Sequence, residues 1–195
     1  MKIPWIILTV VLSIFPVAQA QEQDTLDDAD YALFSHLIDR MAFPIPPPPP
    51  IGSTDTIPSQ ELIDSLSKVK LKVGIYPVVK NVHYSNGSKE RIAECSDEMV
   101  NPTKKVAFKL DLGKLKSKRG HQIKLLDTTM DRNLIYVEHD LIIHFSRPIY
   151  NGDHSRAYLE ISEGRGRLNG YLAAVCLQNE EEFWKVINAV ELSIW

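Results

Sequence analysis

The sequence predicts an α+β domain in which N-terminal helices precede a curved antiparallel β-sheet that ends in a C-terminal β-meander. Apolar residues recur at helical spacing before residue 43, alternate with polar residues from residue 69, and form strand-like runs between polar turns in the last third. A chain of 195 residues has room for one ordinary domain with its own core. We expect a signal peptide (1–20), an N-terminal helix (21–43), a proline-rich linker (44–58) and a single α+β domain (59–195).

The first 20 residues are typical of a bacterial signal peptide. Lys2 provides the basic start, residues 3–15 are mostly apolar, and Ala18-Gln19-Ala20 places small residues at a cleavage point. The apolar run is shorter than the roughly 20 residues that cross a bilayer, so a retained membrane anchor is the weaker alternative. No cysteine follows Ala20 to take a lipid. We expect cleavage after Ala20 and a periplasmic or secreted protein without a stable membrane anchor.

A first helix is predicted over residues 26–42. Residues 25–28 resemble a capping signal, and apolar side chains then recur every three or four positions, at Leu33, Phe34, Leu37, Ile38 and Met41. Pro44 ends this helix. The five prolines of residues 46–50 should form a stiff polyproline II rod of about 15 Å. We expect the rod to act as a spacer that holds the helix at a distance from the domain, while leaving open whether the helix packs back.

The segment from residue 59 to residue 110 predicts a short helix followed by strands. Ser59 is a suitable N-cap for a helix whose apolar face is Leu62, Ile63 and Leu66. Apolar residues alternate with lysines, glycine or alanine at residues 69–75 and 105–110, which is typical of half-exposed strands. Pro77 should limit the first strand, and Asn86-Gly87 is a tight-turn pair.

Four strands are predicted in the C-terminal third, at residues 134–145, 157–162, 171–177 and 183–194. One face of the last strand is expected to carry its apolar side chains, which are Trp184, Val186, Val190, Leu192 and Ile194. Cys176 should share a face with Leu172 and Ala174. An antiparallel meander of this kind takes helices on one face, and strong curvature makes a cone possible, as in NTF2-like folds.

Cys95 and Cys176 are the only cysteines, and they predict a disulfide bond. In an exported protein an even number of thiols is most simply a bridge, because the compartment is oxidising. The closed loop of about 80 residues would be worth about 4 to 5 kcal/mol in the chain-entropy model. Two buried thiols are the alternative. A catalytic cysteine is less favoured, since neither residue lies beside a histidine or in a C-x-x-C motif.

About the last 60 residues resemble the tail of a group of small exported bacterial proteins of unknown function. The matching features are residues 146–151 (S-R-P-I-Y-N), Ala157 opening a strand, a glycine loop, residues 183–186 (F-W-K-V) and Trp195. In that group the loop reads C-G-x-L-C-G, whereas residues 165–170 here read R-G-R-L-N-G. The resemblance implies the fold and export but no activity. It makes a Cys95–Cys176 bridge one candidate for what holds this region in place of the loop cysteines.

Two clusters of positive charge are candidate anion sites. One is the short loop with Lys114, Lys116, Lys118 and Arg119, and the other is the glycine loop with Arg165 and Arg167. For the first, a solvated loop that balances an acidic protein is the favoured interpretation. The second lacks the lysine and the strand–loop–helix context of a phosphate-binding loop, which favours a flexible strand connection.

Glu138, Asp140 and His144 are the candidate catalytic residues. If residues 134–145 form a strand, these three side chains share one face, and a carboxylate and an imidazole lining a pocket would make an acid–base pair. A polar, solvent-facing strand side is the favoured alternative. His139 should point the other way, so we do not expect a metal site with His144.

The formal net charge of −3 argues against nucleic acid as a partner. No cofactor or metal is indicated by the sequence. Two hypotheses follow. The favoured one is a non-catalytic exported binding domain whose curved sheet takes a small apolar ligand or another envelope protein. The alternative is a small envelope hydrolase or isomerase that uses Glu138, Asp140 or His144 in a pocket.

Overall fold

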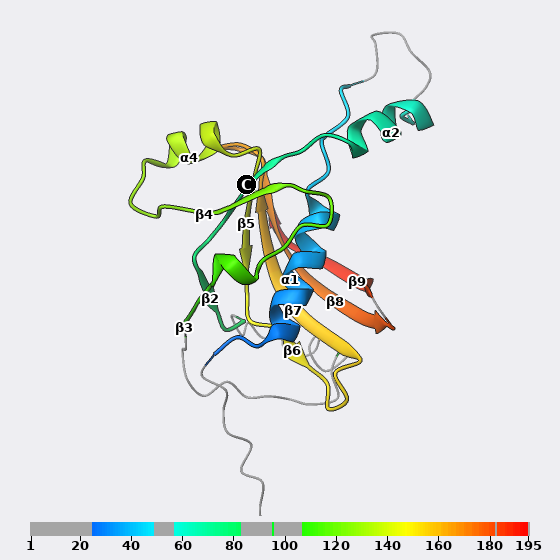
Figure 1. Ribbon diagram of the computed structural model, residues 1–195, viewed down its shortest axis with the longest axis vertical. Helices are drawn as coiled ribbons and strands as arrows, with labels where there is room; N and C mark the ends of the chain where they lie inside the picture. The colour runs from blue at the N-terminus through cyan, green and yellow to red at the C-terminus, as the bar shows by residue number, and fades with distance from the viewer. Residues whose placement is uncertain (1–24, 49–56, 83–94, 96–106, 182, 195) are drawn as a thin grey trace, which may run out of the picture.

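The computed structural model describes residues 25–48, 57–82, 95, 107–181 and 183–194. It has an α+β fold in which helix α1 lies across one face of a mixed seven-stranded sheet (Figure 1). The predicted signal peptide, the end of the proline run and the Asn86-Gly87 turn fall outside these residues. None of the described helices is long and apolar enough to cross a membrane.

Helix α1 (Asp28–Met41) forms where a helix was predicted, and it belongs to the core. A capping box starts it: the Asp27 carboxylate accepts from the backbone N–H of Asp30 at 2.9 Å, and the Asp30 carboxylate accepts from that of Asp27 at 3.1 Å. Phe34 is fully buried and stacks on Phe145 of the sheet, with ring centroids 4.6 Å apart. The expectation that the proline rod holds this helix away from the domain is therefore wrong, because burying the apolar stripe of α1 requires the sheet.

Helix α2 (Gln60–Ser67) and the strands that follow also form near their predicted positions. The Ser59 hydroxyl caps α2, although none of the helix residues is buried. Strand β1 (Lys72–Ile75) ends before Pro77, and β2 (Val78–Lys80) pairs antiparallel with β3 (Ala107–Lys109) in a two-stranded sheet. A 3₁₀ turn, η1 (Leu112–Lys114), and the basic loop then lead to β4 (Gln122–Leu125).

The main sheet has the strand order β4-β1-β5-β7-β8-β9, with the short β6 (Ile149–Tyr150) paired to β7. Its last strands, which are β7 (Arg156–Gly164), β8 (Gly170–Glu180) and β9 (Phe183–Ile194), form the predicted antiparallel meander. The prediction of a wholly antiparallel sheet is wrong, however, because β1 runs parallel to both β4 and β5 (Leu141–Phe145). The chain reaches these parallel neighbours through long connections rather than tight hairpins.

Residues 132–138 form a helix, α4 (Arg132–Glu138), where a strand was predicted from residue 134. The side chain of Asp131 caps it by accepting from the backbone N–H of Asn133 at 2.8 Å. Ile135 is buried against Leu126 and Ile142 on the sheet face opposite α1. A short apolar run does not distinguish a strand from a buried helix, and the strand β5 starts only at Leu141.

The apolar residues of β9 do not share one face, contrary to the prediction. Two register shifts against β8 leave Ile187 and Leu192 without an opposite partner. Each bulge moves the following side chains to the other face of the sheet. Trp184 consequently packs in the core beside α1, whereas Leu192 packs on the opposite face.

The predicted disulfide is confirmed: Cys95 and Cys176 are bonded. The bridge lies on the sheet face away from α1, in a buried cluster with Val82, Tyr158 and Ala174. As predicted, Cys176 lies on the same side of β8 as Ala174. One face of the sheet is therefore covered by α1, and the disulfide lies on the other face.

Candidate ligand-binding pocket

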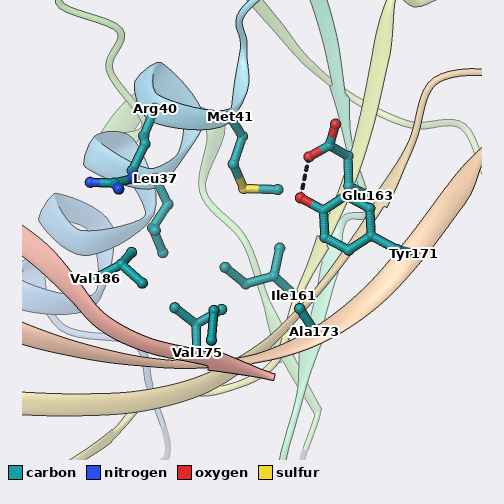
Figure 2. A pocket seen from close by; sticks show the side chains of 10 residues that line it. Leu37, Arg40, Met41, Ile161, Glu163, Tyr171, Ala173, Val175 and Val186 are labelled. Carbon is teal, nitrogen blue, oxygen red and sulfur yellow. Dashed lines mark hydrogen bonds between the residues drawn. The ribbon is translucent and has the colours of Figure 1, made fainter. Parts of the chain in front are cut away.

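A cavity of about 380 Å³ lies between the C-terminal half of α1 and the α1-facing side of β7, β8 and β9 (Figure 2). It is partly open to solvent. Its lining residues are Leu37, Arg40 and Met41 from α1, Ile161 and Glu163 from β7, Tyr171, Ala173 and Val175 from β8, and Val186 and Ala189 from β9.

The walls of the pocket are apolar because of helix and strand periodicity. Leu37 and Met41 lie one turn apart on α1 and project toward the sheet (Figure 2). Ile161 and every second residue of β8 from Tyr171 to Val175 face them. The two alanines in the lining, Ala173 and Ala189, are too short to reach α1, and this shortage of side-chain volume leaves the cavity.

The inner end of the pocket is a buried cluster of polar groups around Glu163, which is 6% exposed. The Tyr171 hydroxyl donates to one carboxylate oxygen at 2.7 Å, and Nε of Arg165 donates to the other at 2.5 Å. A further Arg165 N–H donates to the Met41 carbonyl at 2.6 Å, which ties the sheet to the end of α1. Because Glu163 and Arg165 carry opposite charges, this end of the pocket has no net charge.

Both Glu163 oxygens are engaged, which leaves the carboxylate a poor general base. Burial, reinforced by the bond to Glu163, raises the pKa of Tyr171 above its ordinary value, so the hydroxyl stays protonated. The cluster can orient a ligand through the remaining lone pairs. It offers no activated nucleophile.

Arg40 stands on the rim of the pocket, in the last turn of α1. Its side chain is exposed, and its guanidinium points away from Glu163, toward the other end of the cavity (Figure 2). Within the described part of the chain, no hydrogen bond or ion pair engages it. Of the two charged residues that line the pocket, Arg40 is exposed and Glu163 is buried.

A second hollow, of about 750 Å³, lies between the outer face of α1, the basic loop and the β8–β9 turn. Two of the acidic side chains that line it are engaged by the basic loop. Lys114 forms an ion pair with Asp28 at 2.8 Å, and the Asp39 carboxylate accepts from the backbone N–H of Lys118 at 2.7 Å. Arg119 donates to the carbonyl oxygens of Asp39, Ala42 and Ser67. The basic loop thus fastens the helices. Lys114, Lys116 and Lys118 line this hollow together, and the Asp28 and Asp39 carboxylates line it with them.

The candidate catalytic residues Glu138, Asp140 and His144 do not form a site. Glu138 ends α4 and is exposed, and the exposed Asp140 accepts from the backbone N–H of Lys72 at 2.8 Å. His144 is half-buried against Tyr76, and burial lowers its pKa. The expected common strand face does not exist, because Glu138 is helical. None of the three lines either cavity described above.

Metal binding by His139 and His144 is also not seen. Across the described residues, no three His, Cys, Asp or Glu side chains gather closely enough to hold an ion. The His139 ring instead lies 3.0 Å from the Ile135 carbonyl, within the end of α4.

The glycine loop joins β7 to β8, and its first residue, Arg165, holds the pocket together rather than forming an anion site. The sequence favours a flexible strand connection here, with an anion site as the alternative, whereas the Arg165 guanidinium is bonded to Glu163 and to the Met41 carbonyl. Glu163 itself was missed. Its signal was present in the sequence: Leu159, Ile161 and Glu163 follow each other at strand spacing, so an acidic side chain lies on a face that must be buried.

Comparison of the chain with protein-family models, with curated proteins and with solved structures gives no significant match. The site is therefore interpreted from its own geometry.

Proposed function

We propose that this protein is an exported, non-catalytic binding protein that holds a small apolar ligand in the pocket between α1 and β7–β9. The observation that carries the proposal is a cavity with apolar walls whose two inner polar groups already satisfy each other. Protein interiors are normally packed to high density, and empty apolar volume lowers stability. A ligand would restore the missing contacts.

The size of the cavity supports a small ligand. Its volume of about 380 Å³ falls in the lower part of the usual range of ligand pockets, about 300–1,000 Å³. At about 30 Å³ per non-hydrogen atom, it has room for on the order of ten atoms. A molecule such as a medium-length alcohol or fatty acid has this size.

Export forms part of the proposal. Its supports are the signal-peptide pattern of residues 1–20 and the Cys95–Cys176 bond, since disulfides persist mainly in oxidising compartments such as the periplasm. We also propose that β7–β9 curve around α1 as the wall of a cone. That shape would give the sheet the concave face that a ligand pocket needs.

The test is a titration of the oxidised protein (residues 21–195) with 1-octanol, monitored by ¹H–¹⁵N NMR spectra. We expect saturable shifts at amides of residues 161–175. In Ala173→Leu, which places a larger side chain in the cavity, the affinity should fall at least about tenfold, because the ligand and leucine compete for the same space. Ala107→Leu, on the exposed side of β3, is the matched control and should bind as the wild type does.

Equal octanol affinity in all variants would overturn the proposal, as would shifts located elsewhere. Should Ala173→Leu fail to fold, as judged by its amide spectrum, Ala189→Leu decides the matter. Ala189 lines the same cavity from the exposed strand β9, so a larger side chain there is more easily accommodated.

A further inference from the structure

We infer that the ligand carries a single anionic group, such as a carboxylate, which pairs with Arg40 at the rim while its apolar part lies inward. This inference deepens the proposed function and rests on it. It assigns Arg40 as a specificity-determining residue of the pocket.

The inner end of the pocket is unsuited to an anion. Glu163 and Arg165 are close to fully buried, with side chains 7% and 15% exposed, and their charges cancel at 2.5 Å. A second negative group placed beside Glu163 would be desolvated without a cation of its own. The apolar end of an amphiphile, in contrast, meets Ile161 and Ala173 there.

The rim has the opposite character. Arg40 lines the cavity, is exposed, and is engaged by none of the described side chains through a hydrogen bond or an ion pair. Its neighbour Asp39 forms no ion pair with it: the two Asp39 oxygens accept hydrogen bonds from the Ser117 hydroxyl and the backbone N–H of Lys118 instead. A guanidinium presents paired N–H donors whose geometry matches a carboxylate.

One acidic residue on the same side of the sheet should weaken anion binding, and its removal provides a further test. Glu191 of β9 lies across from Ala173, so it is on the α1 side of the sheet, although it does not line the cavity. Its charge should weaken the binding of an anion near Arg40. Removing that charge with Glu191→Gln should therefore tighten anion binding and leave the binding of a neutral ligand unchanged.

The experiment compares octanoate with 1-octanol, which share their hydrocarbon chain length and differ in charge. Both are titrated by ¹H–¹⁵N NMR at neutral pH into the wild type, Arg40→Gln, Glu191→Gln and Lys116→Gln. Lys116 is the matched control, since it is an exposed cation that lines only the hollow on the outer side of α1.

We expect the wild type and Lys116→Gln to bind octanoate about fivefold more tightly than octanol, which is the size of a favourable exposed charge pair. Arg40→Gln should abolish this preference while its octanol affinity stays within about twofold. The wild-type preference should also shrink as salt is raised.

The inference is overturned if the wild type binds octanol as tightly as octanoate, or if Arg40→Gln keeps the preference. In both cases octanol binding would still support an apolar ligand. Failure of either molecule to bind would instead remove the proposed function itself, so the two failures are distinguishable.

Discussion

Among single residues, Glu163 has the most unusual environment in the pocket. Its carboxylate is buried between an arginine and a tyrosine, and through Arg165 it is linked to the last turn of α1. Buried ion pairs contribute little net stability compared with apolar packing, but removing one partner leaves an uncompensated charge.

Arg165→Met should lower the unfolding free energy by about 3 to 5 kcal/mol, because the buried Glu163 carboxylate loses its charged partner. The double variant Arg165→Met/Glu163→Gln should recover much of that loss, since no buried charge remains. Urea denaturation followed by circular dichroism measures both. Equal destabilisation of the single and double variants would show that the charge is not the cause.

Asp30 makes stability depend on pH. Burial, reinforced by the neighbouring Asp27 carboxylate, raises the pKa of Asp30 to about 6, from an ordinary value of 3.8. The folded protein therefore holds this proton more tightly than the unfolded chain. The stabilisation from this group is complete below about pH 4 and is lost as the pH rises through about 6.

We predict that the wild type loses on the order of 2 kcal/mol relative to Asp30→Asn between about pH 4 and pH 7. Denaturation at several pH values measures this difference. A constant offset is expected in addition, because the amide nitrogen of asparagine cannot accept the bond from the Asp27 N–H. An offset that does not change with pH would contradict the raised pKa.

Among the elements, α1 is the one whose position the sequence left open. Its apolar stripe was visible, but the proline run that follows it made a separate helix the simpler expectation. The structure shows why packing prevails: Leu33, Phe34 and Ile38 are completely buried against the sheet. Leaving these apolar side chains in water would cost the free energy that their burial provides, and a stiff proline spacer offers nothing to replace it.

Phe34→Ala should reduce the unfolding free energy by about 3 to 5 kcal/mol, because it removes a fully buried ring stacked on Phe145. Val137→Ala on α4 is the control, with a side chain that is 81% exposed, and it should change stability by less than about 0.5 kcal/mol. A small effect of Phe34→Ala would mean that α1 is not part of the cooperative core.

The disulfide should stabilise the domain through the unfolded state. It joins residues 81 positions apart, and the chain-entropy model assigns such a loop about 4 to 5 kcal/mol. Cys95→Ala/Cys176→Ala should lose that amount in denaturation experiments. A reducing agent should destabilise the wild type similarly and leave the variant unchanged; sensitivity of the variant would point to another cause.

Sequence patterns predicted most helices and strands, but not which face each strand residue lies on or which strands pair. The helices capped by Asp27 and Ser59, the β7–β9 meander and the disulfide were all predictable from local signals. The bulges at Ile187 and Leu192 were not, because a bulge depends on the partner strand. The parallel pairing of β1 likewise depends on contacts distant in the chain.

In the whole molecule, the two faces of the sheet are covered to different extents. The face away from α1 is packed against α4 and the disulfide cluster, whereas the α1 face is closed near Phe34 and open near Met41. The pocket results from this uneven coverage and could not be predicted, since it depends on which positions of β8 and β9 opposite α1 carry alanine. The sequence pointed instead to Glu138, Asp140 and His144, whose placement required knowing that α4 is a helix.

The most direct test of a ligand pocket between α1 and the sheet is a crystal structure of the oxidised protein with 8-bromooctanoate. The anomalous signal of bromine locates the apolar end of the ligand without ambiguity. We expect a bromine peak between Ile161, Ala173 and Tyr171, with the carboxylate beside Arg40. A peak elsewhere, or an empty pocket at a saturating ligand concentration, would contradict this prediction.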